Sequence, residues 1–132
     1  VIGNKTRPAH DEKAVVLEVI GDVRNKNVLL VDDFTITGGT LIAMAETLKA
    51  RGANDIYAAV THGVLSAGAS ERIQSSVIKR MFVTDTIEFE RPPFSEKISV
   101  ITVAPLFAQA IRSVHDRTSV SNLFPERPTK RA

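Results

Sequence analysis

Residues 28–40 read Val-Leu-Leu-Val-Asp-Asp-Phe-Thr-Ile-Thr-Gly-Gly-Thr, and this stretch decides the fold. Its first four residues form a continuous apolar run, which is typical of a strand covered on both faces in a parallel sheet. We expect this strand to end at Asp32 and Asp33, where two acidic residues interrupt the apolar run. A loop of hydroxyl residues and two glycines follows. The stretch therefore predicts a buried strand that leads through a short loop into the next element.

A helix is predicted directly after this loop. Leu41, Met44, Ala45 and Leu48 recur at the spacing of one helix face. Gly52 follows the last of them, at a position where glycine commonly ends a helix. Strand, loop and helix together form a unit that is typical of α/β proteins.

The rest of the chain continues the same alternation. Because strands and helices alternate, the sequence predicts an α/β domain with a mostly parallel sheet flanked by helices. In such sheets, ligands bind outside the carboxyl ends of the strands. The further strands are expected at 15–20, 55–60, 81–83 and 98–103, the further helices at 69–76 and 105–114, and exposed loops at 3–13 and 90–94.

Size and composition narrow the class of protein. The chain has 132 residues, 43% of them hydrophobic, which suffices for one compact domain spanning 1–132. The net charge is only +2 and the basic residues are scattered, so we expect no nucleic-acid partner. No apolar run approaches the roughly 20 residues of a membrane-spanning helix, so we expect no membrane partner either.

Two features bear on the compartment and on completeness. The chain has no cysteine, which excludes a disulfide framework and a thiolate zinc site, and fits a cytoplasmic protein. It starts Val1-Ile2-Gly3-Asn4, with neither an initiator methionine nor the pattern of a signal peptide. We therefore expect a piece of a longer chain.

The loop after the first buried strand has the chemistry of an anion site. Gly38 and Gly39 let the backbone approach a ligand and adopt dihedral angles closed to other residues. The N–H groups from Thr37 to Leu41 stand at the start of a helix, where they have no helical acceptors. Free donors and the helix dipole both attract an anion there. We therefore expect a phosphate at this loop.

The two acids before the loop add a second kind of contact. Asp32 and Asp33 accept hydrogen bonds when ionised, so they suit the vicinal hydroxyls of a sugar. A phosphate at one end and a diol at the other describe ribose 5-phosphate. The alternative is structural: the same acids and threonines could cap the next helix. Two acids, three threonines and two glycines in a single loop favour the binding interpretation.

Four motifs select a family. The loop at residues 31–40 resembles the ribose-5-phosphate signature shared by type I phosphoribosyltransferases and PRPP synthetases. Lys5-Thr6-Arg7 is similar to the Lys-x-Arg of the synthetases' flexible catalytic loop. Thr61-His62-Gly63-Val64 resembles their Thr-His segment, and the stretch 119–124, Ser-Val-Ser-Asn-Leu-Phe, resembles their C-terminal signature. The resemblance runs from about Lys5 to Phe124 and points to the PRPP synthetases.

The resemblance implies a phosphoribosyltransferase-like fold and the transfer of diphosphate from ATP to ribose 5-phosphate in nucleotide biosynthesis. It implies that Asp32 and Asp33 hold the ribose diol and that Lys5 and Arg7 are the catalytic cations. It also implies Mg²⁺ held mostly by substrate and a missing N-terminal domain, a homo-oligomer, and a fragment that is inactive alone. The residues implied for the 5-phosphate are Ile36, Thr37, Gly38, Gly39 and Thr40.

Other assignments remain open. A type I phosphoribosyltransferase would consume PRPP at the same loop, and a non-catalytic regulatory subunit of a synthetase would keep the fold. His62, at the end of a predicted strand, is expected to be a hydrogen-bonded structural residue rather than a base. The pairs Asp11/Glu12 and Glu88/Glu90 have no histidine beside them, so we assign no metal ligands.

Overall fold

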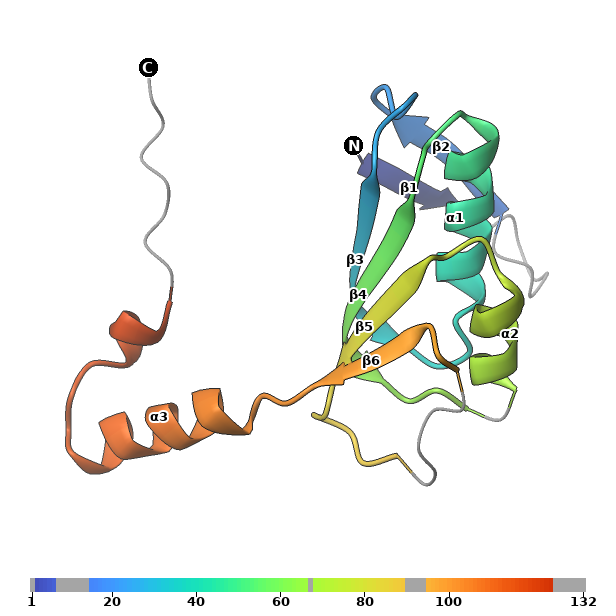
Figure 1. Cartoon of the computed structure of the whole chain (residues 1–132). Helices are drawn as coiled ribbons and strands as arrows, with labels where there is room; N and C mark the ends of the chain where they lie inside the picture. Colours follow the sequence, from blue (N-terminus) through green and yellow to red (C-terminus); the bar gives the residue numbers. More distant parts are fainter. Residues whose placement is uncertain (1, 7–14, 67, 90–94, 125–132) are drawn as a thin grey trace, which may run out of the picture. The chain divides into compact units, whose positions relative to one another are not determined.

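The computed structural model describes residues 2–6, 15–66, 68–89 and 95–124, and of the strands 2–6 and 15–20 only the backbone. The chain divides into two compact units, Val1–Ile101 and Thr102–Ala132. Among the described residues, the first unit contains six strands and two helices, and the second a helix and a 3₁₀ turn (Figure 1). The elements are β1 Ile2–Thr6, β2 Val15–Ile20, β3 Val28–Thr35, α1 Gly39–Ala50, β4 Ile56–Gly63, α2 Ala69–Ser75, β5 Arg80–Thr84, β6 Ile98–Ile101, α3 Ala104–His115 and η1 Val120–Leu123.

The main sheet is parallel throughout. Its strands stand in the order β3-β4-β5-β6, and each neighbouring pair is parallel. β1 and β2 form a separate antiparallel pair. The prediction of an α/β chain with a mostly parallel sheet is thus confirmed, and the carboxyl ends of four strands lie along one edge of the sheet.

β3 is longer than its apolar run. It continues through both acids to Thr35, because Phe34 pairs with His62 and Thr35 pairs with Gly63 of β4. The expectation that the strand ends at Asp32 and Asp33 is therefore wrong. Main-chain pairing with the neighbouring strand, which does not depend on side-chain polarity, carries β3 past the point where hydrophobicity stops.

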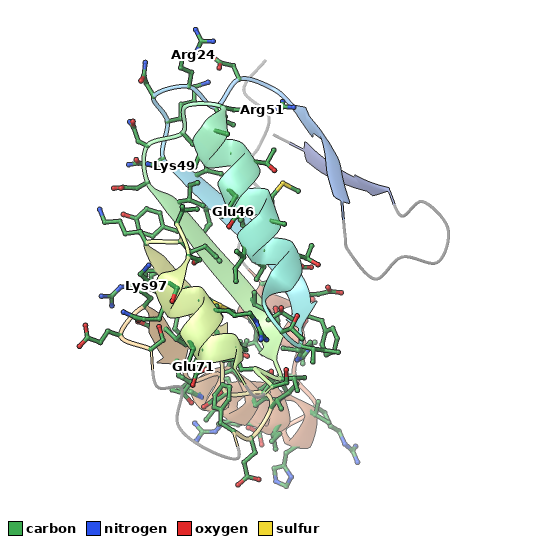
Figure 2. The ribbon with its side chains drawn as sticks, turned by 90° about the vertical axis from the view of Figure 1, so that its right-hand side faces the viewer. Arg24, Glu46, Lys49, Arg51, Glu71 and Lys97 are labelled. Atoms are coloured by element: carbon green, nitrogen blue, oxygen red, sulfur yellow. The ribbon has the colours of Figure 1, made fainter. Side chains whose placement is uncertain are left out.

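α1 covers one face of this sheet. Leu41, Ala45 and Leu48 are its buried residues, at the predicted spacing. Figure 2 shows Glu46 and Lys49 on the outer side of the helix, where both are exposed. Because one face is apolar and the other charged, the helix packs in a single orientation against the sheet.

A single core joins α1, α2 and the inner face of the sheet. α2 contributes Ile73, which is fully buried. The strands contribute alternate residues, as expected when successive side chains point to opposite faces. Figure 1 shows both helices on the same side of the sheet. The strand residues of the core are Ile56, Ala58, Val60, Met81 and Val83, with Val28, Leu30 and Ile98 packed against it.

The opposite face of β3 is not covered by the described residues. Leu29 is 55% exposed and Val31 is 77% exposed. The expectation that the apolar run is buried on both faces is wrong for the described part of the chain. A continuous apolar run marks a strand that can be covered on both sides, but the covering element cannot be read from the run itself.

The N-terminal segment differs from the predicted loop. The expected exposed loop over residues 3–13 begins instead as strand β1, which pairs with β2 from Ile2 opposite Ile20 to Thr6 opposite Val15. The polar composition of this segment concealed a strand, because the strand is defined by its main-chain pairing with β2 and not by an apolar pattern of its own. Residues 7–14 and the predicted loop at 90–94 lie outside the described residues.

The second unit contains the predicted C-terminal helix. α3 carries Pro105 in its first turn, where a missing N–H costs no helical hydrogen bond. The η1 turn follows, and the Ser119 side chain caps it by accepting a hydrogen bond from the Ser121 N–H. Among the described residues, no helix is both long enough and apolar enough to cross a membrane.

Gly63 tests the packing at the end of β4. A Cβ built on Gly63 would overlap the Val83 side chain. We expect Gly63→Ala to lower the free energy of unfolding by about 1–3 kcal/mol, the usual cost of overpacking a core. Urea denaturation measures the change. The matched control is Gly39→Ala, whose new Cβ would meet only the Thr37 Oγ1, at 3.4 Å. Equal stability of the two variants would contradict the packing described here.

Candidate functional site

The site lies where β3 leads into α1. The chain leaves the sheet after Thr35, turns at Gly38 and enters the helix at Gly39. Gly38 is the N-cap residue and has a φ of 74°, a left-handed conformation that glycine adopts without strain. We call residues 35–40 the phosphate turn, after the ligand that the sequence predicts for it. Its position at the carboxyl end of a parallel strand and the start of a helix is the one predicted for ligand binding.

Two threonine hydroxyls shape the phosphate turn from inside. The Gly38 N–H donates to Thr35 Oγ1 at 3.2 Å, and the Gly39 N–H donates to Thr37 Oγ1 at 3.3 Å. The expectation that all N–H groups of this turn stand unpaired is therefore wrong for these two glycines. Thr35 is buried, so its hydroxyl supports the backbone of the turn. A hydroxyl that accepts one hydrogen bond still has its own hydrogen to donate.

A second segment braces the turn from the side. The Val64 N–H donates to the Thr35 carbonyl and the Ser66 N–H to the Ile36 carbonyl, each at 2.9 Å. These bonds continue the β3–β4 pairing beyond the last strand residues. The segment that resembles the synthetases' Thr-His motif thus lies directly beside the phosphate turn, as the parallel order of β3 and β4 requires.

The two acids leave β3 on opposite faces. Asp32 is half-buried and Asp33 is exposed, and successive side chains of a strand point to opposite sides. The Asp33 N–H donates to Asp32 Oδ1 at 3.0 Å. Asp32 lines the same cavity as Thr40, at the start of α1. Of the two acids, Asp32 is therefore the one that shares a surface with the phosphate turn.

This cavity has a volume of about 530 Å³ and follows the free edge of β3. Its middle is lined by apolar side chains of β3 and α1, and its end at Asp32 and Thr40 belongs to the candidate site. Its lining also includes Asp22, Lys26 and Asn27, which precede β3 and lie outside the candidate site. A sugar phosphate needs polar partners, which the apolar length does not offer. We therefore place the site at the phosphate turn and not along the whole cavity.

His62 takes part in a polar cluster at the ends of β4 and β5. Its Nδ1 lies 2.9 Å from the Thr86 hydroxyl, which also donates to the Thr61 carbonyl at 3.0 Å. The Thr84 hydroxyl donates to the same carbonyl at 2.6 Å. The histidine is exposed and hydrogen-bonded, in agreement with the structural role expected for it.

Of the two expected catalytic cations, the structure describes the backbone of one. Lys5 lies in β1 opposite Val16, next to an irregularity of the register between Asn4 and Lys5. Arg7 lies outside the described residues. Within the described ranges, no three histidine or acidic side chains gather in a group that could hold a metal ion.

One residue of the site escaped the sequence-based prediction. Arg72 of α2 reaches the phosphate turn and donates to the Thr37 carbonyl from Nε at 3.3 Å and from Nη2 at 3.1 Å. It is 35 residues from its partner, so no local pattern identifies it. The one local signal is Gly68, four residues before it, which leaves room for a long side chain to fold back.

Known proteins are similar to this chain in sequence and in fold. Two curated relatives named ribose-phosphate pyrophosphokinase are 49% identical over 121 residues, in Caldanaerobacter subterraneus, and 46% identical over 124 residues, in Chlorobaculum tepidum. The alignments cover 92% and 94% of this chain but only 38% of each relative. The chain thus spans well under half the length of the curated relatives it matches.

A solved structure agrees with this similarity. Phosphoribosylpyrophosphate synthetase from Mycobacterium smegmatis superimposes with a TM-score of 0.70 and 36% sequence identity, over 74% of this chain and 33% of that one. The fold is therefore phosphoribosyltransferase-like, as expected. A family model described as the phosphoribosyl synthetase-associated domain matches residues 4–125. On these grounds, the chain belongs to the phosphoribosyl synthetase-associated domain family.

Proposed function

We propose that this chain carries the ribose 5-phosphate site of a ribose-phosphate pyrophosphokinase. Such an enzyme transfers diphosphate from ATP to the 1-hydroxyl of ribose 5-phosphate, giving PRPP and AMP. The observation that carries the proposal is the glycine turn at the junction of β3 and α1, with Asp32 at its entrance. Relatives that bear the name of this enzyme share 49% and 46% of their aligned residues with the chain.

Each part of the turn has a role in this proposal. The 5-phosphate sits at the start of α1, against the backbone from Ile36 to Thr40, where helix donors and the helix dipole favour an anion. Asp32 accepts hydrogen bonds from the ribose hydroxyls, on the face of β3 from which its own side chain projects. Asp33 leaves the opposite face of the strand, so the two acids reach the sugar from different sides.

The transfer step needs cations. The 1-hydroxyl oxygen loses its proton to water and attacks the β-phosphorus of ATP. The bond from this phosphorus to the oxygen that bridges it to the α-phosphorus breaks, and AMP leaves with that oxygen. Catalysis of such a step consists mostly of positioning and of neutralising charge on the phosphoryl oxygens. We assign this role to Lys5 and Arg7. In this proposal, Mg²⁺ would be bound mainly by the ATP phosphates. Mg²⁺ bound to substrate phosphates commonly has few protein ligands.

The proposal extends to the whole protein. The chain spans 38% of the length of its relatives, so the proposed reaction is that of an enzyme of the relatives' full length. A homo-oligomer in the cytoplasm also belongs to the proposal. Leu29 and Val31, apolar and exposed on β3, are compatible with further packing on that face. The same phosphate turn would serve a phosphoribosyltransferase that consumes PRPP, but the relatives' names favour PRPP synthesis.

Gly38 provides the direct test of the phosphate turn. In Gly38→Ala, the new Cβ would lie 3.3 Å from Ile73 Cγ1 in a left-handed conformation that alanine adopts poorly. We expect the change to distort the turn and to weaken ribose 5-phosphate binding by about tenfold or more. This loss corresponds to one or two hydrogen bonds to a charged group. Isothermal titration calorimetry measures the affinity.

Gly52→Ala is the matched control. Gly52 lies at the other end of α1, has a φ of 88°, and a new Cβ there would lie 3.3 Å from Arg24 Cγ. Both variants should lose similar stability, about 1–2 kcal/mol for alanine in this conformation. Only Gly38→Ala should lose affinity for ribose 5-phosphate. If both variants bound the sugar phosphate as tightly as the parent chain does, the site would be misplaced.

The catalytic assignment has its own test, in an enzyme of the relatives' full length that carries this sequence. We expect Lys5→Ala to lower kcat about 100-fold and to change the KM for either substrate little. Removing a group that stabilises charge in the transition state lowers the rate and leaves ground-state binding unchanged. The loss of transition-state stabilisation is about 3 kcal/mol for one donor. Lys49→Ala, at the exposed end of α1, is the control. A raised KM with unchanged kcat would make Lys5 a binding residue.

A further inference from the structure

We propose that Arg72 is a positioning residue that orients the phosphate turn for its anion. The inference rests on the proposed function, because it concerns how the same turn presents its donors. Arg72 belongs to α2, and it holds the turn through the Thr37 carbonyl. The same helix lies close to the turn at Gly38, because a Cβ built there would lie 3.3 Å from Ile73 Cγ1.

The contact is specific in its geometry. Nε and Nη2 of Arg72 both donate to one oxygen, the Thr37 carbonyl, at 3.3 Å and 3.1 Å. Two donors of a planar guanidinium on one acceptor fix the direction of that carbonyl better than a single flexible donor does. Hydrogen bonds from a charged donor are also stronger than those between neutral groups.

The Thr37 carbonyl belongs to the same planar peptide unit as the Gly38 N–H. This N–H donates to the Thr35 hydroxyl at 3.2 Å. The peptide unit is therefore held at both ends, by Arg72 on the oxygen and by Thr35 on the nitrogen. Because the unit is planar, its orientation is fixed directly before Gly38, whose left-handed conformation sets where the next N–H groups point.

Without Arg72, the Thr35 hydroxyl would be the one remaining partner of this peptide unit among the residues that the structure describes. Glycine accepts positive and negative φ about equally, so the peptide unit before Gly38 could rotate at little cost. Rotation would take the Gly38 N–H off the Thr35 hydroxyl and would change the φ of Gly38. The N–H groups that follow Gly38 would then point in another direction. Arg72 thus keeps the turn in a single conformation, the one proposed to bind the anion.

Gly68 makes the contact possible. It precedes α2 with a φ of 80°, and a Cβ there would lie 3.1 Å from Arg72 Nη1. The Arg72 side chain therefore folds back over Gly68 to reach the turn. The glycine, the arginine and the turn form one chain of contacts between α2 and the start of α1.

Two variants of Arg72 separate the effect of its two-donor geometry from the effect of its charge. Arg72→Gln removes the charge and the two-donor contact, whereas Arg72→Lys keeps the charge and loses the planar pair of donors. We expect Arg72→Gln to raise the dissociation constant for ribose 5-phosphate about tenfold, and Arg72→Lys to raise it several-fold, in line with the usual strength of charged hydrogen bonds. Arg80→Gln is the control. Arg80 stands at the amino end of β5, away from the phosphate turn, and donates to Ser99 of β6.

A readout without ligand completes the test. Amide hydrogen exchange at Gly38 should accelerate in Arg72→Gln and stay unchanged in Arg80→Gln, while both variants keep similar melting temperatures. An Arg72→Gln chain with unchanged exchange at Gly38 and unchanged affinity would overturn the inference. If the parent chain itself bound no ribose 5-phosphate, the proposed function would fail, and the exchange at Gly38 would still decide whether Arg72 orients the turn.

Discussion

The parallel pairing of β3 with β4 is the constraint on which the site depends. It continues through Phe34 and Thr35, past the two acids, and is prolonged by the bonds from Val64 and Ser66 to the turn. This pairing fixes where the chain leaves the sheet and so where α1 begins. The packing of α1 on the core then aims the start of the helix at the carboxyl edge of the sheet, where the helix dipole favours an anion.

The local parts of this arrangement could be predicted from the sequence. The spacing of Leu41, Ala45 and Leu48 gave the buried face of α1, and the two glycines marked the turn before it. These signals are local, because a helix face and a glycine turn depend on residues close in sequence. The parallel sheet followed from the alternation of elements, which is a property of the whole chain but needs no knowledge of contacts.

The parts that failed depend on contacts between distant residues. Strand β1 has no apolar alternation and exists because β2 pairs with it. The exposure of Val31 depends on which elements cover the sheet, and the apolar run carries no information on that. Arg72 was missed for the same reason, since its partner lies 35 residues away. The hydrogen bond that the buried Thr35 hydroxyl accepts from the Gly38 N–H also depends on the folded turn, and the sequence did not predict it.

The most direct test of the central claim is a nuclear magnetic resonance titration of the chain with ribose 5-phosphate, following each backbone amide. If the phosphate turn binds this ligand, the amide signals of Gly38, Gly39 and Thr40 shift and saturate together. Inorganic phosphate shifts the same signals more weakly, and ribose alone hardly moves them. Saturable shifts confined to another part of the chain, or none at the turn, would contradict the account.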